Sequence, residues 1–291
     1  MNDILALAKR NCLCYFRDRA SVVFSLMGAL IVILLYLIFL RNMLIDSFVS
    51  ELPMGDRGAI GDLVDAWVLS GILAIVPVLT SAGALQTMIR DRADGRYRDS
   101  MMTSMTPAGL SAAYVLSTYA VGQIMSLVTF IISIAYLAAV GCCLSVSGIM
   151  LTLALTVPSS ISGSIIVYAF VSWIRSEGAF SGFFTVLSVL IGFLTGIYMP
   201  IGTMGTAMQT VSCLVPATHF SALFRQTLAG EAFDRVMIGA PASQIAELRF
   251  DMGFDLKLFG TDFSPLMCWI FIIIVTVVFF AIAVAVSRRK D

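Results

Sequence analysis

The sequence predicts an all-α polytopic membrane protein. Of its 291 residues, 59% are hydrophobic and only 12% are charged, and the mean hydropathy is +0.96. A soluble globular domain has a much larger charged fraction. Several windows of about 20 residues contain no charged side chain, and each is long enough as a helix to cross roughly 30 Å of hydrocarbon. A β-barrel is disfavoured, because its strands are shorter and alternate between apolar and polar residues.

Six uncharged apolar windows predict about six transmembrane helices. The windows are 22–40, 66–89, 112–140, 149–173, 180–199 and 267–286. A helix suits them because, in the absence of water, each backbone donor and acceptor must bond within its own segment. The first window does not look like a cleavable signal peptide, since about twenty residues precede it, it is longer than an h-region, and Arg41-Asn42 follows it without a small-x-small site. We expect it to remain as the first span.

The basic residues predict that both termini lie in the cytoplasm. An even number of spans puts the termini on one side, and basic residues near span ends favour the cytoplasmic side. The side of the termini would hold Lys9, Arg10, Arg17, Arg19, Arg90, Arg92, Arg96, Arg98, Arg175, Arg288, Arg289 and Lys290. The other side would hold Arg41, Arg57, Arg225, Arg235, Arg249 and Lys257. The chain is therefore predicted to be a multi-pass protein of the cell (plasma) membrane.

An amphipathic helix is expected before the first span, over residues 3–17. On a helical wheel, one arc contains Ile4, Leu5, Ala8, Cys12, Tyr15 and Phe16, and the opposite arc contains Asp3, Arg10 and Arg17. Such a helix would lie in the cytoplasmic interface of the membrane. The alternative is an ordinary soluble start to the chain.

The densest cluster of charges lies between the second and third spans, over residues 90–107. Its candidate functional residues are Arg90, Arg92, Asp94, Gly95, Arg96, Arg98 and Asp99. Gly95 can end one helix, and the Ser/Thr-rich run before Pro107 can open another. Basic residues alone would be enough to orient the protein, so the mixture of Arg and Asp favours a protein-docking loop over a solvated connector.

The segment between the fifth and sixth spans has two parts. Residues 201–224 contain no Asp, Glu, Lys or Arg, but Gly202, Gly205 and Pro216 interrupt them, which predicts a re-entrant helical hairpin. A seventh full span is the alternative, but it would place the basic carboxyl end outside. Residues 225–265 are polar and charged, and we expect them to form a small extracellular cap that includes an amphipathic helix over 243–252.

The sequence offers little support for catalysis in this chain. It contains no Gly-Lys dipeptide, so a phosphate-binding P-loop is excluded, and G-x-S-x-G is also absent. An intramembrane enzyme would have to pair the single histidine, His219, with a serine such as Ser162 or Ser164. The formal net charge is zero, which gives no reason to expect nucleic acid as a partner, and no metal or other cofactor is expected in the chain.

Two features of the spans bear on transport and assembly. No ionisable residue lies within the six windows, although secondary transporters commonly use such residues to carry protons or ions. The energy source is therefore expected outside the membrane segment. In the fifth span, Gly192-x-x-x-Gly196 permits close helix packing, either between subunits or within one subunit.

Together these segments resemble the membrane subunit of type-2 ABC exporters over essentially the whole chain. The most specific parts are RDRADGRYRDSMMTSMTPAG, which is similar to the family's coupling helix, and GIYMPIG with LVPATHFSALFRQTLAG, which is similar to the end of its fifth span and its re-entrant hairpin. The resemblance implies a homodimeric or heterodimeric permease driven by a separate cassette ATPase that binds ATP and Mg²⁺. It places the coupling role on residues 90–106, the connecting helix on residues 4–16, and the subunit contact partly on spans one and five. An energy-independent channel or scaffold is the remaining alternative.

Overall fold

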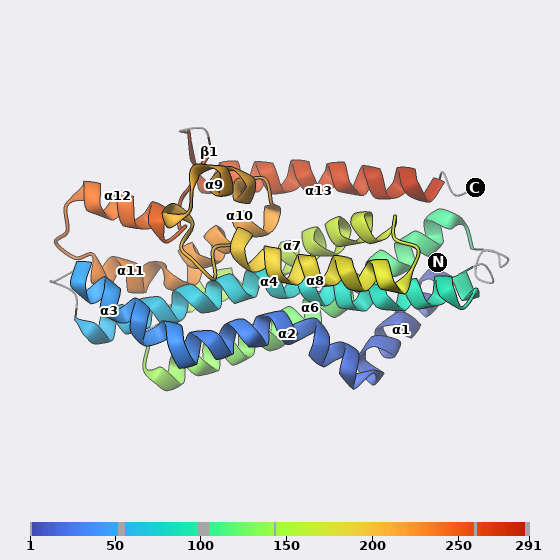
Figure 1. The fold of residues 1–291 in the computed structure, drawn as a ribbon, viewed down its shortest axis with the longest axis horizontal. Helices are drawn as coiled ribbons and strands as arrows, with labels where there is room; N and C mark the ends of the chain where they lie inside the picture. Colours follow the sequence, from blue (N-terminus) through green and yellow to red (C-terminus); the bar gives the residue numbers. More distant parts are fainter. Residues whose placement is uncertain (1, 52–55, 98–104, 143, 259–260, 289–291) are drawn as a thin grey trace.

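The computed structural model describes residues 2–51, 56–97, 105–142, 144–258 and 261–288, and it confirms the predicted all-α membrane fold. Within these ranges, six helices are long and apolar enough to cross a membrane. They form one elongated bundle of roughly aligned helices (Figure 1). The predicted number of spans is therefore correct.

The first span is one continuous helical segment. It consists of α2 (Arg19–Leu35), a π-helical turn η1 (Tyr36–Leu40) and α3 (Arg41–Glu51), and the helix α1 (Asn2–Arg17) precedes it. The other five membrane helices are α4 (Arg57–Ala93), α6 (Pro107–Val140), α7 (Val146–Val171), α8 (Glu177–Leu194) and α13 (Pro265–Arg288). Local sequence explains several of their ends: Asp56 caps α4, and Thr106 caps α6 directly before a proline in its first turn.

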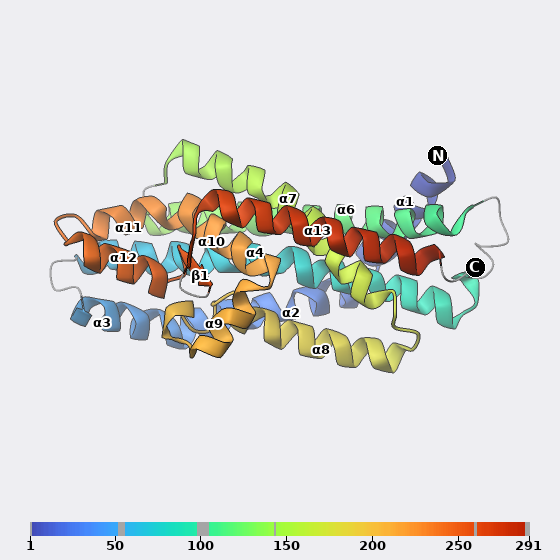
Figure 2. The ribbon, with the colours of Figure 1, turned by 90° about the horizontal axis from the view of Figure 1, so that it is seen from above.

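Helix α4 forms the centre of the bundle. Its most apolar stretch is 89% buried, whereas only 11% of the corresponding stretch of α13 is buried. In Figure 2, α6 and α7 lie on one side of α4, and α2 and α8 lie on the other. The outer helices are left with broad apolar surfaces, as expected for helices that face lipid or another subunit.

Several helices are longer than the apolar windows that predicted them. Helix α4 has 37 residues, which corresponds to about 55 Å, well beyond the roughly 30 Å of a hydrocarbon core. It continues past both ends of its window, and the carboxylates nearest those ends, Asp65 and Asp91, are buried and paired inside the fold, as described below. Residues 41–51 and 57–65, which lie outside the apolar windows, are also helical.

Residues 201–258 and 261–263 form short elements between α8 and α13. They are η2 (Ile201–Thr203), α9 (Thr206–Cys213), α10 (Pro216–Phe224), η3 (Arg225–Ala229), α11 (Gly230–Val236), α12 (Ala242–Asp251) and the antiparallel pair β1 (Leu256–Leu258) and β2 (Thr261–Phe263). The predicted hairpin thus contains two short helices, and its insertion into a membrane stays a prediction. No helix ends at the expected boundary at residue 224, because the helix continues from α10 through η3 into α11.

The two ends of the bundle differ in what they contain. The helix α1, the carboxyl end of α13, the end of α4 and the start of α6 lie at one end, and α3, α11 and α12 lie at the other (Figure 1). This agrees with an even number of crossings. The cytoplasmic assignment of the first end stays a prediction, as does the extracellular assignment of the cap.

Arg225 corrects the expectation that the cap begins as polar surface. Its side chain is completely buried and donates hydrogen bonds to the backbone oxygens of Thr195, Gly196 and Gly253. The guanidinium also lies over the ring of Trp67, with its central carbon 4.9 Å from the ring centroid. Arg225 therefore ties the end of α8 to α4 and to the segment after α12.

Candidate functional site

The candidate site lies where α4 ends, at the start of the charged 90–107 segment. The last helical residue of α4 is Ala93, and the amide of Asp94 donates to the carbonyl of Arg90 at 2.9 Å. Gly95 has φ +80°, a left-handed conformation that glycine adopts at little cost. The prediction that Gly95 ends a helix is confirmed. Arg98 and Asp99 lie outside the described residues.

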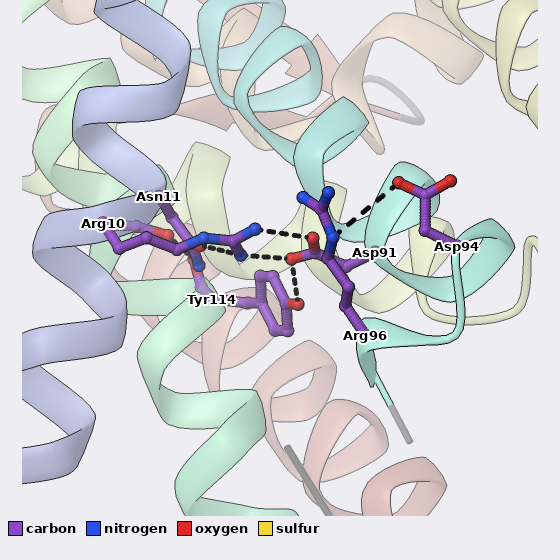
Figure 3. A network of polar contacts seen from close by, with 7 residues as sticks. Arg10, Asn11, Asp91, Asp94, Arg96 and Tyr114 are labelled. Carbon is purple, nitrogen blue, oxygen red and sulfur yellow. Dashed lines mark hydrogen bonds and ion pairs between the residues drawn. The ribbon is translucent and has the colours of Figure 1, made fainter. Parts of the chain in front are cut away.

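The centre of the site is a buried carboxylate, Asp91, that the sequence analysis did not single out. Arg10 of α1 binds it with two hydrogen bonds of 2.5 and 2.8 Å, and the hydroxyl of Tyr114 in α6 donates a third at 2.8 Å (Figure 3). The side chain of Asp91 is 4% exposed and that of Arg10 is 35% exposed. The hydrogen bonds to Asp91 raise the pKa of Arg10 above its usual range, so the guanidinium stays charged.

The contact with Asp91 changes how the amphipathic helix is interpreted. Arg10 was expected on the polar face, opposite the apolar arc, but it points into the protein. Only part of that arc packs against the bundle: Ala8 and Tyr15 are buried, whereas Leu5 and Phe16 remain exposed. One flank of α1 thus binds the bundle while the other still presents apolar side chains, which suits a position in a membrane interface.

A second ion pair joins the same elements at the surface. Arg90 lies 3.2 Å from Asp18, which occupies the junction between α1 and α2. Hydrogen bonds from the hydroxyl and amide of Ser21, together with Arg90, lower the pKa of Asp18. Both charged side chains are partly exposed, so this bridge contributes little to stability. They line a polar cavity of about 150 Å³ between α1, α2 and the end of α4.

Arg92 serves a structural purpose within the chain. Its guanidinium donates to the carbonyl oxygen of Ile174 at 2.7 Å and to those of Val171 and Ser172 at longer distances. These carbonyls belong to the end of α7, where the chain turns back toward α8. The charge also lies 5.2 Å from the centroid of the Tyr97 ring. Arg92 therefore holds the second connection at this end of the bundle against α4.

Asp94 and Arg96 differ from Asp91 and Arg92 because they face solvent. Their side chains are 58% and 64% exposed, and their charged groups lie 4.0 Å apart. Figure 3 shows them beside the buried Asp91 contact, on the turn that follows α4. Of the described residues predicted to dock a partner, Arg90, Asp94 and Arg96 form the accessible charged surface.

The proposed subunit contact at Gly192 and Gly196 is not supported by the geometry of these two residues. Helix α8 ends at Leu194, and Gly196 has φ +71°, so the two glycines do not share one helix face. An added Cβ at Gly192 would lie 2.2 Å from the ring of Tyr198, and one at Gly196 would lie 2.5 Å from Ile201. The space that the glycines leave is filled by the same chain.

A groove follows the boundary between α2 and α8. Two adjoining cavities of about 610 and 460 Å³ lie along it and share Val189 and Tyr198 in their linings. Exposed apolar side chains flank the groove on both helices, including Phe24 and Leu34 on α2 and Val186 on α8. Spans one and five thus present an apolar surface that nothing in the described chain covers.

The residues of the alternative enzyme hypothesis are engaged elsewhere. The Nε2 atom of His219 lies 2.8 Å from the carbonyl oxygen of Cys213, and its ring packs against Phe271. Ser162 accepts a hydrogen bond from Thr276 on α13, and Ser164 donates to the carbonyl of Ile161. The expected pairing of histidine and serine is therefore absent from the hydrogen bonds described for these residues.

The fold and this site define a polytopic membrane protein with a charged segment at the end of its central helix. Comparison with protein families identifies the group to which it belongs: the family described as "ABC-2 family transporter protein" matches residues 64–285. The match covers most of the chain, so the protein is a member of the ABC-2 transporter family and a transport component. No curated protein matches the chain in a direct comparison.

Proposed function

We propose that the chain is the membrane subunit of an ATP-driven exporter, powered by a separate cassette ATPase. The observation that carries the proposal is the family match over residues 64–285, which includes most of α4 and the charged segment that follows it. The P-loop pattern is absent from the sequence, so ATP binding and hydrolysis are assigned to the partner.

The ATPase is proposed to dock on residues 90–107 at the cytoplasmic end. Arg90, Asp94 and Arg96 supply exposed charges of both signs there, which suits a partner surface of mixed charge. Exposed ion pairs contribute only about 0 to 1 kcal/mol each, so the affinity must come from the combined surface. Because this surface begins at the end of α4, docking would act directly on the most buried helix of the bundle.

Two permease subunits are proposed to form the translocation pathway, with spans one and five at their contact. Support comes from the exposed apolar side chains that flank the α2–α8 groove. The glycines of the fifth span no longer contribute to this argument. A homodimer and a heterodimer with a similar permease would cover this apolar surface equally well.

The docking proposal is tested by co-purification from membranes. The double variant Asp94→Ala with Arg96→Ala should lose most of the bound ATPase, because it removes exposed charges without touching the contacts of Asp91 or Arg92. Arg175→Ala is the matched control, since Arg175 is exposed in the other connection at the same end of the bundle. Equal ATPase recovery from the double variant and the wild type would refute docking at this segment.

Membrane orientation needs a separate test. Single cysteines introduced by Asp94→Cys and Asp56→Cys in a cysteine-free chain should react differently with a membrane-impermeant thiol reagent applied to intact cells. We expect labelling at position 56 and none at position 94 until the cells are permeabilised. The reverse pattern would overturn the cytoplasmic assignment of the termini.

A further inference from the structure

Two buried carboxylates mark the ends of the uncharged part of α4. Asp65 is completely buried and Asp91 is 3% exposed, and they bracket the apolar window 66–89. They are 26 positions apart, which corresponds to about 39 Å along the helix axis. The two carboxylates therefore lie near opposite ends of the same crossing.

The outer carboxylate holds the first span. Arg41 at the start of α3 binds Asp65 with two hydrogen bonds of 2.9 and 2.8 Å. The hydroxyls of Tyr36 in η1 and Tyr136 in α6 also donate to it. We call this set, Asp65 with Arg41, Tyr36 and Tyr136, the outer clamp.

The inner carboxylate has partners of the same kinds from the same parts of the chain. Asp91 is bound by Arg10, which precedes the first span, and by Tyr114 of α6. We call these three residues the inner clamp. Each clamp thus joins an aspartate of α4 to an arginine of the amino-terminal segment and a tyrosine of α6, and it does so at one end of the crossing.

Between the clamps, the first span contacts the bundle with one face only. One face of α2 packs closely on α4, with Ser25 so near Gly83 that an added Cβ would lie 2.4 Å away. The opposite face is bare, and Leu34 and Ile38 are each 58% exposed. The π-helical turn η1 lies directly before Arg41, and such turns are frequent at functional sites.

The two clamps differ in what surrounds them. The outer clamp has two tyrosine donors and is far from the 90–107 segment. The inner clamp has one tyrosine donor, and its aspartate lies three residues before Asp94, in the last turn of α4. Its arginine belongs to α1, a helix that leaves several apolar side chains exposed. Asp91 thus lies at the start of the docking segment and connects it through Arg10 to α1, beside the surface bridge between Arg90 and Asp18.

We propose that Asp91 is a positioning residue for transport: the inner clamp is the joint through which the docking segment moves the first span, and the outer clamp is its pivot. This inference rests on the proposed function, because the movement is driven by the partner ATPase. It predicts that α1 shifts relative to α6 when the ATPase binds nucleotide, while α3 keeps its distance from α6.

The test measures two distances by spin labelling in the complex of permease and ATPase, reconstituted in lipid nanodiscs. In a cysteine-free background, one pair of labels replaces Leu13 and Leu116, and the other replaces Met43 and Val140. All four side chains are exposed. Addition of a non-hydrolysable ATP analogue should change the first distance and leave the second unchanged. Equal changes in both distances, or no change in the first, would overturn the proposal.

Variants then assign the movement to the clamp. Asp91→Asn and, as a milder change, Arg10→Gln should abolish the nucleotide-dependent shift between α1 and α6. The exchanged pair Arg10→Asp with Asp91→Arg should restore at least part of it, because the contact between the two charges re-forms. Arg249→Gln is the matched control, because Arg249 forms a 2.7 Å ion pair with Asp255 away from both clamps. An unchanged shift in Asp91→Asn would refute the role of this residue.

A second measurement does not need the ATPase. In the permease alone, Asp91→Asn should raise backbone amide exchange in α1 by tenfold or more, while Arg249→Gln leaves it unchanged. Unaltered exchange in Asp91→Asn would show that the clamp does not hold α1 and would overturn the inference. Failure of any ATPase to bind the wild-type chain would instead refute the proposed function, and the two failures are therefore distinguishable.

Discussion

The ion pair between Arg41 and Asp65 allows a quantitative test of how burial controls the strength of a charge contact. Asp65 is fully buried and Arg41 is 29% exposed, with 2.8 Å between Nη2 and the carboxylate. The pair between Arg57 and Asp46 has a similar distance, 2.7 Å, but its side chains are 63% and 61% exposed. The two pairs thus differ mainly in their contact with water.

The expected magnitudes follow from the bonds that each change removes. Asp65→Asn leaves Arg41 at most one hydrogen bond, to the neutral amide oxygen, in place of two to a carboxylate, and it weakens the bond from Tyr36. Charge-assisted bonds contribute about 1.5–3 kcal/mol and neutral ones about 1 kcal/mol, so we expect a loss of about 2–4 kcal/mol. The exposed part of Arg41 keeps the loss below the cost of a fully buried orphaned charge.

A double-mutant cycle in mixed micelles measures these terms by reversible unfolding. The cycle of Arg41→Gln and Asp65→Asn should give a coupling energy of about 1.5–3 kcal/mol. The matched cycle of Arg57→Gln and Asp46→Asn should stay below about 1 kcal/mol. Equal coupling energies in the two cycles, or a value below about 0.5 kcal/mol for the buried pair, would refute the reasoning.

Two further predictions concern single residues. Gly192→Ala should destabilise the protein by about 1–3 kcal/mol in the same unfolding assay, because the added Cβ meets the Tyr198 ring. The control Gly182→Ala, in the open part of α8, should be neutral or stabilising, and equal effects of the two changes would contradict the prediction. Burial, aided by the nearby charge of Glu247, raises the pKa of Asp251, so the folded protein favours the protonated carboxyl. The folded state is therefore stabilised below a pH of about 4, and this contribution is lost as the pH rises through the raised pKa of Asp251. Asp251→Asn should therefore raise the thermal midpoint at neutral pH but not at pH 4, and a lower midpoint at neutral pH would contradict the assignment.

The sequence was most informative about the existence of the spans and least informative about where they end. A window defined by the absence of charge must stop at Arg41 and at Asp65, yet these two residues neutralise each other inside the fold, and both helices continue. The contact joins positions 24 residues apart, so no local pattern could reveal it.

The exposed charged residues of the candidate site were predicted, but its buried ion pair was not. Gly95, Asp94 and Arg96 were found because a cluster of charges after an apolar span is visible in the sequence. Asp91 was grouped with the loop, although extension of α4 by one turn would have placed it three residues after the buried Met88 and on the same helix face. Arg10 gave no comparable signal, because the helical wheel describes α1 alone and not its contact with α4.

The burial of Arg225 and the backbone conformation of Gly196 could not be predicted from the sequence. Arg225 follows an apolar run and resembles the start of a polar surface, but its partners Thr195 and Gly253 come from distant segments that only the tertiary fold brings together. Gly196 fitted a helix-packing motif only as long as the helix was assumed to continue. The helix α8 in fact ends before Gly196, whose backbone is left-handed.

The central claim is that a separate ATPase binds the segment after α4, and site-specific photo-crosslinking in native membranes tests it most directly. A photoreactive side chain at position 96 should form an adduct with an ATPase, whereas the same group at position 43, in α3 at the opposite end of the bundle, should form none. An ATPase adduct at position 43, or none at position 96 while the ATPase is bound to the same membranes, would contradict the account.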